Sequence, residues 1–455
     1  MNSQKFSNLP LTQEMLSNLD KIGYSTMTPI QADSLPLILD SKDVIAQAKT
    51  GSGKTAAFGI GILSRLNVKK FRVQSLLLCP TRELADQVAK ELRQIAKFAH
   101  NIKILTLVGG ASFGQQLGSL RHGAHIIVGT PGRVLKHLDK ESLNLENLET
   151  LVLDEADRML DMGFIEEIEK VIAYAPKERQ TLLFSATYPD EIMSMSRKLQ
   201  KDAVKVETIS VESTNKIVER FYKVDGDKLQ TLANIFSTFN PVNAIVFCNT
   251  KVETDAVAQK LQKMKIDAIA LHGDMEQYDR NDVLVQFSNA SARVLVATDV
   301  AARGLDIKEL AMVVNYDLPH GEETYTHRIG RTGRAGAEGL AFTLFSSYEE
   351  EKIEEYRNET RIFESQESLK VQQNFDMKPK NITLVIEGGK KDKLRAGDLL
   401  GALTGDAGLK GSSIGKIDIY DRQAYVAIER EFIDEAQKKL SHGKIKKKKF
   451  SVWIL

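Results

Sequence analysis

The sequence predicts two α/β domains with parallel sheets, followed by a small α+β domain. Short apolar runs rich in Val, Ile and Leu alternate with helix-length segments, which is typical of a parallel α/β sheet. A polar stretch interrupts this rhythm, which then repeats before a different pattern begins. At 455 residues, the chain also exceeds what one hydrophobic core usually serves. We therefore expect domains at residues 1–206, 220–365 and 376–455, with a linker at 207–219.

Apolar runs mark the expected strands of the first two domains. In the first domain these runs are 43–46, 74–79, 125–128, 150–153 and 181–184. In the second domain they are 244–247, 268–271, 293–296, 312–314 and 340–344. A charged segment then carries Ile353 and Tyr356, which could seat a closing helix.

A polar cluster follows nearly every run. These clusters are GSGKT, PTREL, GTPGR, DEAD and SAT in the first domain, and CNT, HGD, ATD and NYD in the second. In open parallel sheets, ligands bind outside the carboxyl ends of the strands. We therefore expect the clusters at one edge of each sheet, and a cleft where the two sheets face each other.

The last domain is predicted from four strand-like runs, NITLVIEGG, SIGKIDIYD, RQAYVAIER and KFSVWIL. Helices are expected at AGDLLGALTG, after the first run, and at EFIDEAQKKL, after the third. This β-α-β-β-α-β order is the ferredoxin-like plan used by RNA-recognition motifs. Residues 376–455 hold 17 Lys and Arg against 11 Asp and Glu, a net charge of +6, so the remainder of this +1 chain carries −5. The basic character is concentrated at the C-terminus.

The composition argues against a membrane-spanning or disulfide-bonded protein. No apolar stretch reaches the ~20 residues of a membrane span, and the N-terminus lacks the charged start and apolar run of a signal peptide. We therefore expect a cytoplasmic protein. Cys79 and Cys248 each end an apolar run and are expected to be buried, reduced thiols. No Cys/His cluster has zinc-binding spacing.

Three motifs indicate hydrolysis of a nucleoside triphosphate. The first has the P-loop pattern, although Ala48 replaces the usual opening Gly; Lys54 would reach the phosphates and Thr55 would bind magnesium. The second, LVLDEAD at 151–157, supplies carboxylates for that magnesium and for an attacking water. The third, HRIGRTGR at 327–334, offers three arginines, and one arginine finger is worth roughly 10³- to 10⁵-fold in phosphoryl transfer. The first motif comprises Ala48, Lys49, Thr50, Gly51, Ser52, Gly53, Lys54 and Thr55.

With further motifs in the same order, the chain resembles a DEAD-box RNA helicase from Phe6 to Arg334. The additional motifs are GYSTMTPIQ, PTRELA, the pair Gly109 and Gly110, TPGR, SAT, QYDR and ATDVAARGLD. The resemblance implies two tandem RecA-like domains, an ATP-dependent RNA helicase activity, and ATP and Mg²⁺ as cofactors.

The resemblance also implies how ATP is held. Gln31 would hydrogen-bond the adenine edge, while Phe6 and Tyr24 pack against the ring. A hydrogen-bonded base edge discriminates well, because the wrong base leaves buried polar groups unpaired. As an alternative, Phe6 is merely an anchor in the core. Asp154 would hold magnesium, and Glu155 would orient and deprotonate the attacking water.

Further residues would couple hydrolysis to conformation. Asp157 would tie the first-domain cluster to Ser185 and Thr187. Arg331 and Arg334 would be fingers on the γ-phosphate that act only when the two lobes close. The resemblance also places His327 as a bridge towards the first lobe and Asp306 near the ribose.

RNA is the expected driver of closure, because the chain matches the family's RNA-contacting positions. Many of these residues are small, hydroxyl-bearing or glycine, and therefore suit phosphate and 2'-hydroxyl contacts better than base edges. Binding by the two α/β domains should then be largely independent of RNA sequence, and strand separation should be local. The positions are Thr81, Arg82, Gly109, Gly110, Thr130 and Arg133 in the first domain, and Thr250, Gly273, Gln277, Arg280, Thr298 and Arg303 in the second.

The last domain departs from an ordinary RNA-recognition motif. Such a motif stacks bases on aromatic residues at alternate positions of its third strand, but the outward set here is Gln423, Tyr425 and Ala427. Thr383 and Val385 of the first strand add no ring. Only Tyr425 remains as a stacking candidate, so we expect RNA to use another surface as well.

That surface is the basic segment GGKKDKLRAGD, whose charges suit a structured RNA that presents phosphates at defined spacing. Together with GLKGSSIGKI, it resembles the DbpA-like branch of bacterial DEAD-box helicases. The resemblance implies binding to a hairpin of large-subunit ribosomal RNA, pre-ribosomal particles as partners, and a role in ribosome assembly. The residues concerned are Lys390, Lys391, Lys393 and Arg395, with Lys410 and Lys416 as further candidates.

Several alternatives stay open. Lys444 and residues 446–449 fit a solvated tail or strand edge as well as an RNA contact, and Trp453 is expected to pack before it stacks. The chain could be an ATP-gated RNA clamp or ribonucleoprotein remodeller, although the complete hydrolytic set favours the helicase. The C-terminal domain could bind protein, bind another structured RNA or dimerise. A monomer is the default expectation.

Overall fold

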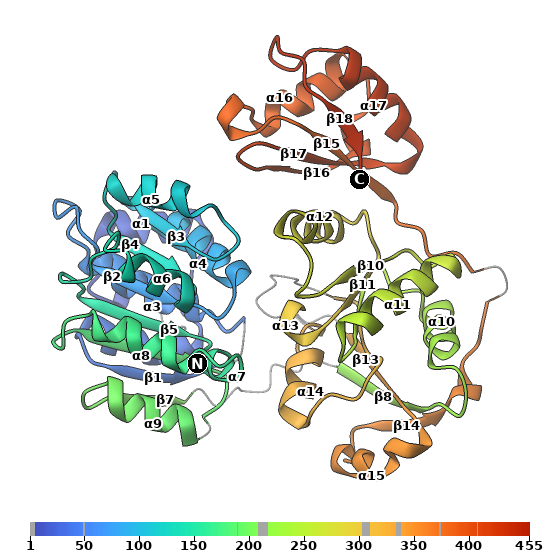
Figure 1. Ribbon diagram of the computed structural model, residues 1–455, viewed down its shortest axis with the longest axis horizontal. Coiled ribbons are helices and arrows are strands. Elements are labelled where there is room, and N and C mark those ends of the chain that lie inside the picture. Colours follow the sequence, from blue (N-terminus) through green and yellow to red (C-terminus); the bar gives the residue numbers. More distant parts are fainter. Residues whose placement is uncertain are drawn as a thin grey trace. The chain divides into compact units, whose positions relative to one another are not determined.

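The computed structural model describes residues 5–48, 51–188, 190–207, 217–302, 310–333, 338–372, 375–406 and 408–455. The chain forms two compact units that divide near residue 211. The first unit is one α/β domain, and the second contains another α/β domain and the C-terminal domain (Figure 1). Within these residues, the helices are too short or too polar to cross a bilayer.

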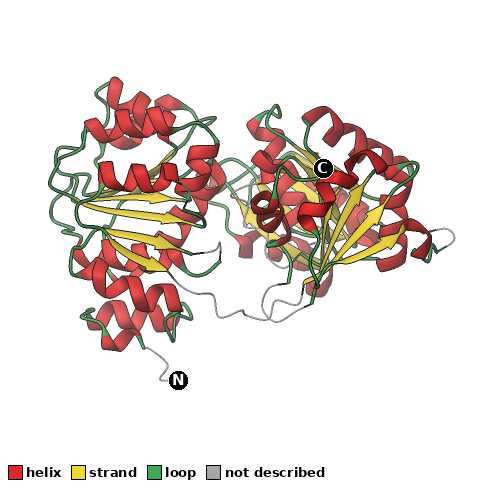
Figure 2. Cartoon of the chain, turned by 90° about the horizontal axis from the view of Figure 1, so that it is seen from below, coloured by secondary structure: helices red, strands yellow, loops and turns green. Residues whose placement is uncertain are grey.

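The first unit is built on a parallel seven-stranded sheet with helices on both faces (Figure 2). Its strand order is β3-β4-β2-β5-β6-β1-β7. The strands are β1 (Val44–Gln47), β2 (Ser75–Leu78), β3 (Ile104–Leu107), β4 (Ile126–Gly129), β5 (Thr150–Asp154), β6 (Gln180–Ser185) and β7 (Val204–Glu207). The helices are α1 (Gln13–Lys21), α2 (Pro29–Leu39), α3 (Lys54–Arg65), α4 (Arg82–Ile95), α5 (Phe113–Arg121), α6 (Pro131–Asp139), α7 (Ala156–Asp161), α8 (Ile165–Ala173) and α9 (Asp190–Leu199).

Burial on both faces explains the apolar runs. Successive side chains of a strand point to opposite faces of the sheet. Accordingly, Val152 lies in one hydrophobic cluster, whereas its neighbours Leu151 and Leu153 lie in another. All three are fully buried, and each contributes about 1.5–3 kcal/mol relative to an exposed position. The central strands must therefore be apolar throughout.

The second unit repeats this plan in its α/β domain. The sheet order β10-β11-β9-β12-β13-β8-β14 is parallel throughout. The strands are β8 (Ile217–Lys223), β9 (Ala244–Phe247), β10 (Ala268–Leu271), β11 (Val294–Ala297), β12 (Met312–Asn315), β13 (Gly339–Phe345) and β14 (Ile362–Ser365). The helices are α10 (Lys228–Phe239), α11 (Lys251–Lys263), α12 (Gln277–Ser288), α13 (Asp299–Ala302), α14 (Glu322–Ile329) and α15 (Glu350–Ile353), followed by a 3₁₀ turn, η4 (Glu354–Tyr356).

The C-terminal domain has an antiparallel sheet of order β16-β17-β15-β18. Its strands are β15 (Asn381–Ile386), β16 (Ile414–Ile419), β17 (Ala424–Glu429) and β18 (Val452–Ile454). Helices α16 (Ala396–Gly401) and α17 (Ile433–His442) contribute Leu399 and Leu440 to a core shared with Leu384 and Val426. The element order and sheet confirm the ferredoxin-like prediction.

Some elements escaped prediction. Strands β3, β7, β8 and β14 were not expected, and β8 begins at Ile217, inside the expected 207–219 linker, of which 208–216 lie outside the described residues. β7 and β8 carry charged residues and are only partly buried, so they lack an uninterrupted apolar run. Ile353 and Tyr356 are buried, which confirms the predicted closing helix at α15 and η4.

Candidate nucleotide and RNA sites

Strand order sorts the polar clusters of the first unit into two groups. The phosphate loop, DEAD and SAT follow β1, β5 and β6, which are neighbours on one side of the sheet. PTREL, the glycine pair and TPGR follow β2, β3 and β4, which are neighbours on the other side. Because all these strands are parallel, every cluster lies at the same edge. The residues predicted to bind the nucleotide and those predicted to contact RNA thus occupy adjoining halves of that edge.

The phosphate loop ends in an anion-binding helix start. Gly53 precedes α3 with φ 93°, and the free backbone amides at the start of this helix favour phosphate. Lys54 is buried, and its Nζ has no hydrogen-bond partner among the described residues. Ser52 Oγ is buried and unpartnered in the same way. Of the expected loop residues, Lys49 and Thr50 lie outside the described residues.

Asp154 and Glu155 lie buried at the end of β5. Within the described chain, Asp154 Oδ1 has no hydrogen-bond partner, and burial raises the pKa of this carboxyl, while Lys54 opposes the shift. A buried carboxylate without a partner is costly, so the site suits a divalent cation with oxygen ligands such as Mg²⁺. Glu155 has φ 55° and pairs with Arg158 at 2.7 Å, a partner that the sequence did not indicate.

Asp157 joins the DEAD and SAT motifs. Its Oδ2 accepts hydrogen bonds from the amides of Ala186 and Thr187, both at 3.0 Å, and from Thr187 Oγ1 at 3.2 Å. Its own amide donates to Ser185 Oγ at 3.3 Å. Bonds to an ionised acceptor are stronger than neutral ones, so this carboxylate fixes the ends of β5 and β6 relative to each other.

Gln31 links its own segment to the phosphate loop. Its amide oxygen accepts from Thr28 N at 2.9 Å, and Nε2 donates to Gly53 O at 3.0 Å. Phe6 is 3% exposed and makes an edge contact with Tyr24, which favours the interpretation of Phe6 as a core anchor.

Arg82 lies across the glycine pair in the other half of the edge. Gly110 has φ 72°, a left-handed conformation that favours glycine, and a Cβ there would lie 1.8 Å from Arg82 Nη1. Arg133 donates to Ala111 O at 2.9 Å, and burial followed by the nearby Arg82 charge lowers its pKa. Two guanidinium groups that repel each other form a site suited to phosphate. Thr81 and Thr130 stand at the N-caps of α4 and α6.

In the second unit, the residues predicted to contact RNA follow β9, β10 and β11, which are again neighbours in the sheet. Thr250 caps α11, as Thr81 caps α4, by accepting from a backbone amide three residues on. Arg280 on α12 donates to Ala301 O on α13 at 2.8 Å. Gly273, Gln277 and Thr298 lie in the same half, whereas Arg303 and Asp306 are outside the described residues.

The three arginines of the third motif have different environments. Arg328 is 1% exposed, pairs with both oxygens of Asp299 at 2.7 Å, and lies 5.1 Å from the centre of the Phe247 ring. These contacts make it a structural centre of the domain. Arg331 lies two residues after the end of α14 and is buried, and His327 lies on α14. Arg334 is outside the described residues.

The expectation that Tyr425 stacks on RNA is not met in the structure. Tyr425 is 3% exposed, packs against Val285 of α12 together with Val385 and Trp453, and donates to Asp282 Oδ1 at 2.7 Å. Residues on the same sheet face reach α12 and the loop after it as well: Gln423 donates to Tyr278 Oη, and Asn289 donates to Thr383 Oγ1 at 2.9 Å. The sheet face that binds bases in other motifs is covered by a helix of the neighbouring domain. Sequence periodicity identified this face but not its cover.

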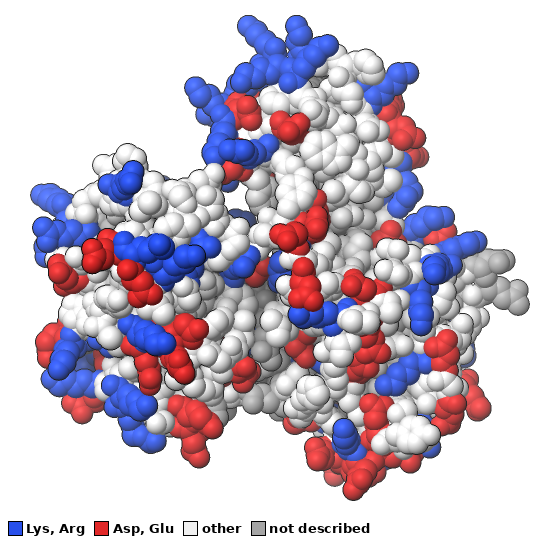
Figure 3. Space-filling model, viewed as in Figure 1, with Lys and Arg blue, Asp and Glu red and all other residues white. Residues whose placement is uncertain are grey.

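The basic segment instead borders a pocket of the C-terminal domain. The pocket has a volume of about 320 Å³. Lys446 Nζ donates to Lys393 O at 2.9 Å, which joins the late lysine turn to the early basic segment. Gly389 allows this segment to approach the β16–β17 turn, because a Cβ there would lie 2.3 Å from Tyr420 O. Figure 3 shows Lys and Arg gathered at the top of this domain. The pocket is lined by Lys391, Asp392, Lys393, Leu394, Lys446, Lys448 and Phe450.

Comparison with known proteins assigns the family. The family model for DEAD/DEAH box helicases matches residues 28–195, and that for the helicase conserved C-terminal domain matches 227–336. This chain belongs to the DEAD-box RNA helicases. A third model, the DbpA RNA binding domain, matches residues 383–454, which places the helicase in the DbpA-like branch.

Individual relatives agree with this assignment. The helicase is 49% identical to the ATP-dependent RNA helicase DbpA of Escherichia coli (strain K12), over 98% of each chain. It is 38% identical to the ATP-dependent RNA helicase DbpA of Bacillus subtilis (strain 168), over 93% of each. Among solved structures, S. cerevisiae Dbp5 bound to RNA and ADP BeF3 aligns with a TM-score of 0.71 and 30% identity, over 80% of this chain and 96% of that one.

We expect Asp157→Asn to reduce RNA-stimulated ATP hydrolysis by the helicase more than tenfold. The NH₂ group of asparagine cannot accept a hydrogen bond, but it must face either the SAT donors or the Arg158 amide. At least one bond is then lost, and each bond to a carboxylate is worth about 1.5–3 kcal/mol. Steady-state turnover and ATP affinity should be measured together. The exposed Glu149→Gln serves as the control. Unchanged turnover in Asp157→Asn would contradict the coupling role.

We expect Tyr425 and Asp282 to couple energetically. A double-mutant cycle of Tyr425→Phe and Asp282→Asn, measured by urea unfolding, should give a coupling of about 1–3 kcal/mol. Tyr425→Phe keeps a ring that could stack on a base. If Tyr425→Phe left stability unchanged, and RNA affinity fell only in a variant that lacks the ring, Tyr425 would be an RNA contact.

Proposed function

We propose that this helicase separates short RNA duplexes close to an anchor in large-subunit ribosomal RNA, and that it serves ribosome assembly as a cytoplasmic monomer. The observation that carries the proposal is the lysine-lined pocket of the C-terminal domain. It supplies a compact basic surface on a domain whose sheet face is covered. Such a surface suits the phosphates of a folded RNA better than splayed single-stranded bases.

The ATP site supports hydrolysis within this proposal. Lys54 would bind phosphate oxygens, and Thr55 and Asp154 would hold Mg²⁺, which when bound neutralises phosphate charge. Glu155 would orient the attacking water and take its proton. Arg331 and Arg334 would supply positive charge to the γ-phosphate, and His327 would bridge towards the first lobe. Asp157 would link the site to the SAT segment.

Two alternatives are weaker. An ATP-gated clamp does not need the full hydrolytic set described above. A protein-binding or dimerising C-terminal domain was suggested by its weakly aromatic sheet face, but α12 of the same chain occupies that face. The lysine pocket offers an external partner a basic surface, and its charge favours RNA.

The proposal is tested by steady-state ATP hydrolysis with the full chain. The RNAs compared are none, a generic single strand, a generic hairpin and large-subunit ribosomal RNA. We expect ribosomal RNA to activate at a concentration at least tenfold lower than the others. Equal activation by every RNA would leave the helicase assignment intact and refute ribosomal targeting.

We also expect the pocket lysines to carry the anchoring. Lys446→Gln with Lys448→Gln should weaken ribosomal RNA binding at least tenfold and lower the slope of log affinity against log salt by about 2, because two phosphate contacts are lost. Lys447→Gln with Lys449→Gln is the matched control, because these lysines alternate with the first pair but do not line the pocket. Equal effects of the two pairs would show that only overall charge matters.

A further inference from the structure

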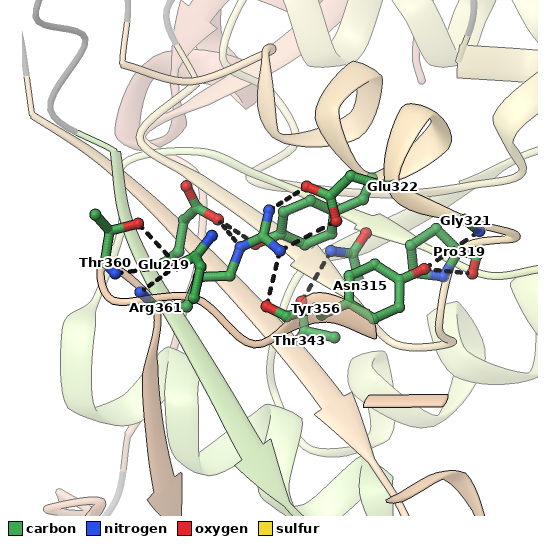
Figure 4. A network of polar contacts seen from close by, with 11 residues as sticks. Glu219, Asn315, Pro319, Gly321, Glu322, Thr343, Tyr356, Thr360 and Arg361 are labelled. Atoms are coloured by element: carbon green, nitrogen blue, oxygen red, sulfur yellow. Dashed lines mark hydrogen bonds and ion pairs between the residues drawn. The ribbon is translucent and has the colours of Figure 1, made fainter. Parts of the chain in front are cut away.

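Arg361 lies at the centre of a polar cluster beneath α14 (Figure 4). It precedes β14 directly, and its side chain is 7% exposed. Its Nε donates to Glu219 Oε2 at 2.8 Å, and its two terminal nitrogens bind both oxygens of Glu322. Nη1 also donates to Tyr356 O at 2.8 Å. The guanidinium thus ties three separate chain segments together.

Aromatic contacts complete the cluster. The Arg361 guanidinium lies 4.5 Å from the centre of the Tyr325 ring, and Tyr325 donates to Glu219 Oε2 at 2.8 Å. Tyr325 is fully buried on α14, so Arg361 contacts this helix through a charge pair and through a ring. The carboxylates of Glu322 and Glu219 raise the pKa of Arg361, although burial alone would lower it. The planar guanidinium suits this position, because it binds both oxygens of one carboxylate at once, whereas an ammonium group acts as a point charge.

Helix α14 is held by these contacts at its start and by the Arg328–Asp299 pair near its end. It has only 8 residues, and isolated helices of that length are unstable. Gly321 at its N-cap supplies no side-chain cap. Instead, Tyr356 Oη accepts from Gly321 N at 3.2 Å and donates to Pro319 O at 3.0 Å. The start of the helix is therefore held by Tyr356 and Arg361, both from the segment after β13.

The far end of α14 leads to the proposed finger. Arg331 follows two residues after the helix ends at Ile329, and its amide donates to Arg328 O at 3.3 Å. From Glu322 to Arg331 the chain advances about 13 Å at the helical rise. A tilt of about 5° at the start would move the far end by about 1 Å, and a misplacement of about 1 Å can cost a hundredfold in rate.

We propose that Arg361 is a positioning residue that sets the direction of α14 and thereby the placement of Arg331. This inference rests on the proposed role of Arg331 as a finger. Both Glu219 and Arg361 lie outside the residues matched by the helicase C-terminal domain model, 227–336. Strand β8, which carries Glu219, and the start of the edge strand β14, which follows Arg361, therefore contribute to catalysis through the helix that they support.

The test compares Arg361→Met and Arg361→Lys with the unaltered helicase, at a temperature well below the melting temperature of each protein. We expect Arg361→Met to lower kcat of RNA-stimulated ATP hydrolysis about tenfold or more, with KM for ATP and for RNA changed less than about twofold. Arg361→Lys keeps the charge and should recover part of kcat. Glu322→Gln, at a half-exposed position, removes the same pair from the other side and should lower kcat in the same way.

Arg357→Met is the matched control. Arg357 comes from the same segment, pairs with Glu354 at 2.8 Å and rests on the Phe363 ring at 4.4 Å. It should leave kcat unchanged. A loss of kcat in Arg357→Met as large as that in Arg361→Met would overturn the proposal, because any disturbance of the segment would then suffice.

The decisive measurement places Arg361→Met in an Arg331→Ala background. If Arg361 acts through Arg331, the second substitution should cause no further loss of kcat. Fully multiplied losses would overturn the proposal, as would a normal kcat in Arg361→Met when Arg331→Ala alone is impaired. A normal kcat in Arg331→Ala alone would refute the finger role and the inference with it, and this outcome is recognised from the single variant.

Discussion

Parallel pairing of strands buried on both faces is the constraint on which the rest of the structure depends. It places every strand-to-helix loop of a domain at one edge, and the strand order then decides which loops are neighbours. In both α/β domains this order separates the loops predicted to bind nucleotide from those predicted to contact RNA, with β2 beside β5 and β9 beside β12 at the boundaries. A change at either boundary is therefore adjacent to both kinds of residue. The predicted coupling between RNA and ATP therefore needs no long path within either domain.

Buried charges divide into two classes with different meanings. Arg328 and Arg361 are buried with their hydrogen-bond donors engaged by carboxylates and carbonyls, and they organise the second unit. Lys54 and Asp154 are buried with polar atoms that have no partner among the described residues. Burying such groups without partners is costly. The paired arginines therefore stabilise the fold, whereas Lys54 and Asp154 are suited to binding a ligand. Sequence alone does not distinguish the two classes, because charged residues of both classes lie in polar segments.

Sequence patterns predicted the central strands of the two parallel sheets because full burial demands apolar residues without interruption. They failed at β8 and β14, where charged residues interrupt the apolar run, and these are the strands that bring Glu219 and Arg361 beneath α14. The family resemblance linked Asp157 to Ser185 and Thr187, and the structure shows these hydrogen bonds. The motifs could not show that Arg328 is structural or that Tyr425 is covered, since both depend on contacts between residues far apart in the chain.

The covering of the C-terminal sheet by α12 has a consequence for work with fragments. A fragment that begins after β14 loses Asp282 and Val285, and with them the partners of Tyr425, Val385 and Trp453. Water would then reach an apolar sheet face that is dry in the whole chain, and such faces promote self-association. A dimer or a base-stacking surface observed in that fragment would be a property of the cut, and a faithful fragment has to retain α12.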